Sequence, residues 1–244
     1  MGDSFGQPPN TLAAIASAIA AGADMVEVDV SITEDEVLVA THGPRLDHWT
    51  DGRGHVHRMP WAVIQELRAR HSRGGAFSEE GVPSFAQVLE TVDGQVPLNV
   101  DVKRQSAADA AIRAVGERRQ AYVISGLIPR QVRGVLGRHP GVPVLVNLGP
   151  LDKLIAKSSF LRTRWLCRGR QRRLLQHPDV VALNINHEWV DDRLVAAVHD
   201  AGAQVWVFTV TDTEGWLRAA TLRVDSITVD DPKRHGGGPH SPSA

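Results

Sequence analysis

The sequence contains a single cysteine, Cys167, so an internal disulfide framework cannot form. So little cysteine is typical of proteins that work in a reducing compartment. No apolar run reaches the roughly 18 residues that a membrane-spanning helix needs. The first residues, MGDSFGQPPN, have neither the basic nor the apolar region of a signal peptide. These absences predict a cytoplasmic protein without stable membrane insertion, and they leave the oligomeric state open.

An excess of charge of one sign is also missing. The 27 lysines and arginines nearly balance the 28 acidic residues, for a net charge of −1. This balance predicts no general attraction to nucleic acid or to anionic membranes. Six arginines gather in RTRWLCRGRQRR at 162–173, where Trp165 is the lone aromatic residue. We interpret that segment as a solvated helix face, or as a contact for lipid-like substrates, rather than as a nucleic-acid or anionic-lipid patch.

What the sequence has in abundance is short Val/Ile/Leu runs that alternate with helical patterns. Near-continuous apolar runs are typical of parallel strands buried on both faces, so the alternation predicts an α/β fold. Asn10 and Thr11 fit an N-terminal cap of the first helix. The predicted strands are 24–30, 37–42, 97–103, 121–126, 143–148, 180–186, 204–210 and 225–230. The predicted helices are 10–21, 60–70, 84–92, 106–119, 129–138, 151–176, 189–201 and 212–220.

One strand breaks this rhythm. Only SITEDE separates the runs at 24–30 and 37–42, which is too short for a parallel crossover and suits a hairpin. Without the hairpin strand, seven barrel strands remain, whereas a (β/α)₈ barrel has eight. Since the chain opens on a helix, the sequence predicts a TIM barrel with a small hairpin insert, whose first strand is missing before residue 2. We expect one barrel domain at 1–232 and a disordered Gly/Pro/Ser-rich tail at 233–244.

Polar side chains fall on one face of two predicted strands, at their carboxyl ends. Because side chains alternate along a strand, Glu27 and Asp29 share a face, as do Asn99, Asp101 and Lys103. Barrel active sites form at these strand ends. Carboxylates that meet there favour Mg²⁺ or Ca²⁺, and Lys103 would suit a phosphate. The alternative is that these groups pair with arginines in ordinary polar layers.

A histidine, His42, closes the hairpin beside this group. A histidine can act as general acid or base near neutral pH, and it can equally be an ordinary residue of a surface loop. Spacing alone does not decide between these two interpretations.

The order of motifs resembles the glycerophosphodiester phosphodiesterase family. The similar segments are PPNT at 8–11, AGAD at 21–24, EVDV at 27–30, VATHG at 39–43, VDVK at 100–103, VWVFTV at 205–210 and VDSITVDDP at 224–232. The resemblance extends over essentially the whole chain to about residue 232. It implies a barrel with one hairpin insert, metal ligands at Glu27, Asp29 and Asp101, a catalytic histidine at His42, and Lys103 near the substrate phosphate.

The resemblance further implies a hydrolase of phospholipid head-group and glycerol metabolism. Its reaction would be metal-dependent hydrolysis of small glycerophosphodiesters to sn-glycerol 3-phosphate and an alcohol. The sequence departs from the family pattern at Pro9, Gly43, His48, Gly126 and Phe208, and the first of the family's two catalytic histidines would fall before Met1. Two alternatives follow. One is an impaired or inactive barrel that binds a phosphorylated ligand, and the other is a lipid phosphodiesterase like sphingomyelinase D.

Overall fold

A computed structural model describes residues 2–71, 76–118, 120–148 and 169–235 of the chain. Contacts within the chain define two compact units. The first unit comprises Met1–Leu98, Arg118–Ala121 and Val229–Ala244, and the second comprises Asn99–Glu117 and Tyr122–Thr228.

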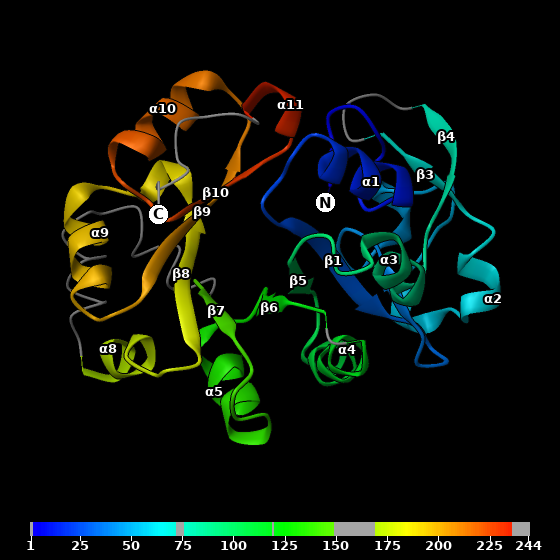
Figure 1. The fold of residues 1–244 in the computed structure, drawn as a ribbon. Helices are drawn as coiled ribbons and strands as arrows, with labels where there is room; N and C mark the ends of the chain where they lie inside the picture. The colour runs from blue at the N-terminus through cyan, green and yellow to red at the C-terminus, as the bar shows by residue number, and fades with distance from the viewer. Residues whose placement is uncertain (1, 72–75, 119, 149–168, 236–244) are drawn as a thin grey trace. The chain divides into compact units, whose positions relative to one another are not determined.

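The second unit repeats a strand followed by a helix, and its neighbouring strands run parallel (Figure 1). Helices α5, α8 and α9 pack on strands β7, β8 and β9, and both faces of these strands are buried. This arrangement explains the continuous apolar runs of the sequence. Its elements are β5 (Leu98–Val102), α4 (Gln105–Glu117), β6 (Tyr122–Ser125), α5 (Pro129–Arg138), β7 (Val144–Asn147), α8 (Gly169–Leu175), β8 (Val180–Asn186), η3 (His187–Trp189), α9 (Asp192–His199), β9 (Gln204–Val210), α10 (Thr213–Thr221) and β10 (Ser226–Val229). The first residue of β5, Leu98, and the last residue of β10, Val229, are assigned to the first unit.

The first unit holds the predicted hairpin. Strands β1 and β2 pair antiparallel, with Val30 opposite Ala40 and Ile32 opposite Leu38. A small apolar cluster around Leu46 and Val56 packs against β2 and supports the segment that follows it. The elements are α1 (Leu12–Ala20), β1 (Val26–Ile32), β2 (Leu38–Ala40), η1 (Leu46–His48), η2 (Val56–Arg58), α2 (Trp61–Ile64), β3 (Arg68–Arg70), β4 (Phe77–Gly81), α3 (Phe85–Val92) and α11 (Pro232–His235).

The strand order agrees with the predicted barrel topology. The eight-stranded sheet runs β10-β9-β8-β7-β6-β5-β1-β2, so each barrel strand lies beside its neighbour in sequence and β2 is the added hairpin strand. Within the first unit, the backbone N–H of Gly2 donates to the Glu27 carbonyl at 3.2 Å, and that of Phe5 donates to the Asp230 carbonyl at 3.1 Å. Residues 2–5 therefore link β1 to the segment that follows β10.

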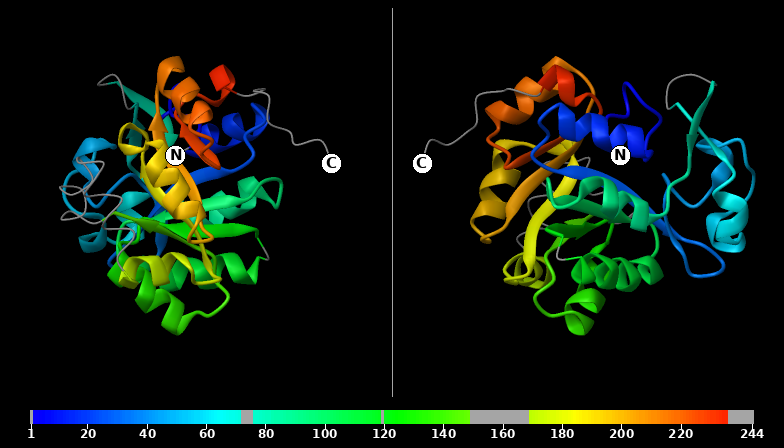
Figure 2. Two further views of the ribbon diagram at one scale, coloured as in Figure 1. Left: turned by 90° about the vertical axis from the view of Figure 1, so that its left-hand side faces the viewer. Right: turned by 45° about the vertical axis from the view of Figure 1, so that its right-hand side comes forward.

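Two predicted segments differ from the structure. The helix predicted at 60–70 ends at Ile64, and the chain then forms β3, which pairs antiparallel with β4 (Figure 2). Residues 233–235 of the predicted tail belong to the short helix α11, and residues 236–244 lie outside the described residues. Most of the predicted helix 151–176 lies outside them as well, and its described part is α8. None of the described helices is long and apolar enough to cross a membrane.

The buried carboxylate of Asp3 connects the first residues of the chain to α1 and α11. Its side chain is 1% exposed and accepts hydrogen bonds from the Gly6 backbone N–H at 2.9 Å and from the Ser17 hydroxyl at 2.7 Å, and Lys233 Nζ lies 3.1 Å away. Burial by itself raises the pKa of Asp3, but the bonds from Ser17, Gly6 and Lys233 outweigh it and hold the pKa below its ordinary value. The folded state therefore favours the charged form of this carboxyl.

We expect Asp3→Asn to lower the free energy of unfolding at pH 7 by about 1–3 kcal/mol. Because the pKa of Asp3 is depressed on folding, its stabilisation is fully present above about pH 5 and is lost as the pH falls below about 4. Urea unfolding at pH 7 and pH 3 should thus show a smaller gap between wild type and variant at pH 3. The exposed Asp24→Asn serves as control. A gap that stays constant or widens at pH 3 would contradict this assignment.

Candidate active site

Asp29 is a buried acidic side chain of the first unit that two side chains contact. It is 1% exposed on β1, and its Oδ2 accepts hydrogen bonds from Asn10 Nδ2 and His42 Nδ1, both at 2.8 Å. In return the Asp29 backbone N–H donates to Asn10 Oδ1 at 2.9 Å. The hairpin prediction thus places His42 correctly beside Asp29, because β2 ends just before it.

Asn10 takes part in this site in a way that the sequence analysis missed. Thr11 alone caps α1, since its hydroxyl accepts from the Ala14 N–H, whereas Asn10 adopts a left-handed backbone conformation (φ 64°) that turns its amide to Asp29. Asparagine tolerates this conformation better than most residues because its short polar side chain bonds locally. The sequence signal at this position is the Asn-Thr pair of the PPNT segment, whose residue types by themselves favour helix capping.

The His42 side chain also packs against the aromatic ring of Trp49. The Trp49 ring meets the His42 ring edge to face, with centroids 4.5 Å apart, and the histidine side chain is 37% exposed. Gly43 follows with φ +84°, the left-handed region that favours glycine. A residue with a Cβ would be strained in this backbone conformation at position 43.

Asp101 and Lys103 lie at the carboxyl end of β5 in the second unit. Lys103 Nζ is 2.9 Å from Asp101 Oδ2, and both side chains are about four-fifths buried, at 21% and 19% exposed. Both residues line a cavity of about 320 Å³ in this unit, which also contains Asn147, Asn184 and Phe208. A cavity of this size at the carboxyl ends of parallel strands is where small ligands bind in α/β proteins.

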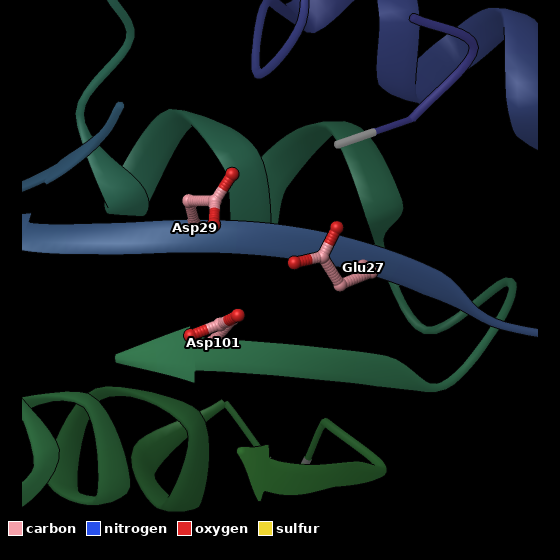
Figure 3. Close-up of side chains that lie close together, drawn as sticks. All are labelled: Glu27, Asp29 and Asp101. Atoms are coloured by element: carbon pink, nitrogen blue, oxygen red, sulfur yellow. The ribbon is translucent and has the colours of Figure 1, made fainter. Parts of the chain in front are cut away.

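Three of the predicted site residues form one acidic group. Carboxylate oxygens of Glu27, Asp29 and Asp101 lie within 4.8 Å of one another, the first two on β1 and the third on β5 (Figure 3). Such a donor set, made only of carboxylate oxygens, fits a hard divalent cation and does not fit a soft metal. The acidic cluster could therefore bind a metal ion.

Gly126 keeps space open for Asp101. The glycine has φ +79°, and a Cβ placed there would collide with Asp101 Oδ1 and with the backbone of Val102. Gly22 has the same φ of +79°, but a Cβ there would meet nothing within 4 Å. Substitutions at these two glycines therefore distinguish the cost of backbone strain, which both share, from the cost of a steric collision, which occurs at Gly126 alone of the two.

We expect Gly126→Ala to destabilise the protein clearly more than Gly22→Ala. The latter incurs only the left-handed strain of about 1–2 kcal/mol, whereas the former must also displace Asp101 or β5. Thermal unfolding of both variants measures the difference. Equal losses of melting temperature would show that Asp101 has room to adjust.

Comparison with known proteins finds one family over nearly the whole chain. The family model described as "Glycerophosphoryl diester phosphodiesterase family" matches residues 2–234. A glycerophosphodiester phosphodiesterase of Caldanaerobacter subterraneus subsp. tengcongensis is 28% identical over 242 residues, covering 95% of this chain and 92% of that protein. A crystal structure of the Agrobacterium tumefaciens glycerophosphodiester phosphodiesterase is 26% identical, with a TM-score of 0.70 and coverage of 95% and 94%.

A further solved structure shares the fold. An Oleispira antarctica phosphodiesterase in complex with the product sn-glycerol-3-phosphate superposes with a TM-score of 0.80, at 23% identity, over 96% of this chain and 92% of that one. Together with the family match over nearly the whole sequence, this likeness confirms the α/β barrel class that the alternation of strand and helix patterns predicted. The chain belongs to the glycerophosphoryl diester phosphodiesterase family.

Proposed function

We propose that this protein hydrolyses glycerophosphodiesters to sn-glycerol 3-phosphate and an alcohol, with Mg²⁺ or Ca²⁺ bound by Glu27, Asp29 and Asp101. The observation that carries the proposal is the acidic cluster beside a histidine held on one of its members. Membership of the family supports the reaction class. The substrate would be a small molecule, and the reaction belongs to phospholipid head-group and glycerol metabolism.

His42 would move the proton that hydrolysis requires. The Asp29 carboxylate accepts a hydrogen bond from Nδ1, which orients the ring and places the exchangeable proton of the neutral imidazole on Nδ1. Nε2 is then the nitrogen that takes or gives a proton at the substrate. Such an arrangement, in which a carboxylate orients a histidine, is common among general acid–base catalysts.

Lys103 would contact the phosphate. Its ammonium adds a positive charge beside the carboxylates, and its ion pair with Asp101 holds it at the end of β5. A bound divalent cation would neutralise charge that develops on the phosphoryl oxygens. The lysine and the acidic residues therefore have complementary tasks in holding an anionic diester.

The direct test is an assay with glycerophosphocholine. We expect release of sn-glycerol 3-phosphate in Mg²⁺ or Ca²⁺ and its loss in EDTA, with recovery after metal is restored. The proposed reaction would be refuted if neither glycerophosphocholine nor glycerophosphoinositol gave product in Mg²⁺ or in Ca²⁺. Equal rates with and without EDTA would refute the metal requirement alone.

A further inference from the structure

The cavity of the second unit carries a row of asparagines that the proposed reaction does not use. Asn147 on β7 and Asn184 on β8 are opposite one another in the parallel ladder, and Asn186 follows two residues later on the same face of β8. All three line the cavity of about 320 Å³. Asparagine is uncommon within strands, so three of them at one cavity call for an explanation.

Asn184 is the central member of this row. Its side chain is 6% exposed, and within the described part of the chain no hydrogen bond engages its amide. Buried amides are nearly always hydrogen-bonded, because an unmade bond costs free energy. An unpartnered amide that faces a cavity therefore indicates a ligand group that bonds to it.

The two flanking asparagines present N–H groups in a fixed orientation. Asn147 Oδ1 accepts from the Gly126 backbone N–H at 3.0 Å, and Asn186 Oδ1 accepts from the Glu188 backbone N–H at 2.8 Å. Because each side-chain oxygen is engaged by a backbone donor, each Nδ2 is the atom left to donate. The row thus offers uncharged donors, with one amide at its centre that can both donate and accept.

We propose that this asparagine row, Asn147, Asn184 and Asn186, binds the alcohol part of the diester and selects a polyhydroxylated head group such as glycerol or inositol. Hydroxyl oxygens accept from amide N–H groups and donate to an amide oxygen, so they satisfy all three residues. A trimethylammonium group offers no hydrogen-bond acceptor. The inference rests on the proposed function for the identity of the diester.

The charges of the cavity agree with an uncharged head group. Among its described lining residues, the ionisable pair is Asp101 and Lys103, which lie 2.9 Å apart as an ion pair. A cationic head group would have to compete with Lys103 for Asp101. The rings of Trp189 and Phe208 also line the cavity, and such rings pack on the carbon skeleton of a polyol as well as on a methylated amine.

The test is calorimetric binding to the full chain in EDTA, with glycerophosphoinositol and glycerophosphocholine as ligands. We expect the inositol diester to bind about tenfold more tightly, and Asn184→Leu to remove this preference. Leucine matches asparagine in size but cannot hydrogen-bond, and Asn184→Ala replaces it if the leucine variant does not fold. Ser125→Ala, which deletes a buried hydroxyl on β6 outside the cavity lining, should leave the preference intact.

Three outcomes would overturn the inference. The first is that the two diesters bind equally tightly or not detectably. The second is that Asn184→Leu keeps the preference for the inositol diester. The third is that Asn184→Leu loses as much affinity for sn-glycerol 3-phosphate alone as it loses for the inositol diester. The last would place Asn184 on the shared glycerol phosphate instead of the alcohol. Turnover in a parallel Mg²⁺ experiment tests the proposed function separately, so hydrolysis of neither diester would refute that function while the affinities still decide the inference.

Discussion

Replacing Glu27 with glutamine is expected to lower metal-dependent turnover by about 10²–10³-fold or more. The substitution preserves the size of the side chain and removes one negative charge from a group of carboxylates within 4.8 Å of one another. Because hard cations are held mainly by the charge and number of their oxygen ligands, the affinity for Mg²⁺ should fall as well. The loss in activity should therefore accompany a loss in binding.

The same substitution makes an opposite prediction for stability without metal. Carboxylates that lie close together repel one another, so Glu27→Gln should raise the melting temperature in EDTA. In Mg²⁺ the wild type should gain stability from the bound ion and the variant should gain little. Calorimetric titration with Mg²⁺ and thermal unfolding in both conditions measure these effects.

The matched control lies on the same hairpin. Glu34 is an exposed glutamate in the turn after β1, and Glu34→Gln removes the same charge from the protein outside the cluster. It should leave Mg²⁺ affinity and turnover unchanged. If Glu27→Gln binds Mg²⁺ as tightly as this control does, the acidic cluster is not the metal site.

The sequence pattern predicted the barrel strands well because buried parallel strands have a strong signature. The run at 180–186 coincides with β8 and that at 204–210 with β9, since both faces of such strands are covered and apolar residues fill them. The hairpin followed from a linker too short for a crossover, and this fixed the position of His42 next to β1. Chain geometry, rather than residue preference, made that prediction succeed.

The features that the sequence pattern did not predict depend on contacts between residues that are distant in sequence. Arg68–Arg70 has no strand pattern, and it becomes β3 because it pairs with β4 and because Arg70 N–H donates to the Trp49 carbonyl. Asn10 reaches Asp29 only through a left-handed turn that local rules do not foresee. The asparagines of β7 and β8 were visible as polar breaks in apolar runs, but their neighbourhood at one cavity depends on the strand register.

Replacing His42 with glutamine should lower kcat by about 10²–10⁴-fold, the range that a positioned general acid or base contributes. Glutamine can still donate a hydrogen bond toward Asp29, but its amide does not exchange a proton near neutral pH. Because the histidine side chain is 37% exposed and Asn10 continues to hold Asp29, the variant should fold and keep its Mg²⁺ affinity. A lower kcat with unchanged Mg²⁺ affinity would distinguish the role of His42 from that of the carboxylates, whose substitution should weaken metal binding as well.

His48→Gln provides the comparison, since His48 is an exposed histidine six residues further along the chain. It should retain the wild-type kcat, which excludes a general effect of removing a histidine from this loop. Retention of more than about a tenth of the wild-type kcat by His42→Gln would contradict a role in proton transfer, because the loss would fall below that range. His42 would then serve only to orient Asp29, and its loss should appear as weaker Mg²⁺ binding, because the hydrogen-bond partners of metal ligands tune metal affinity.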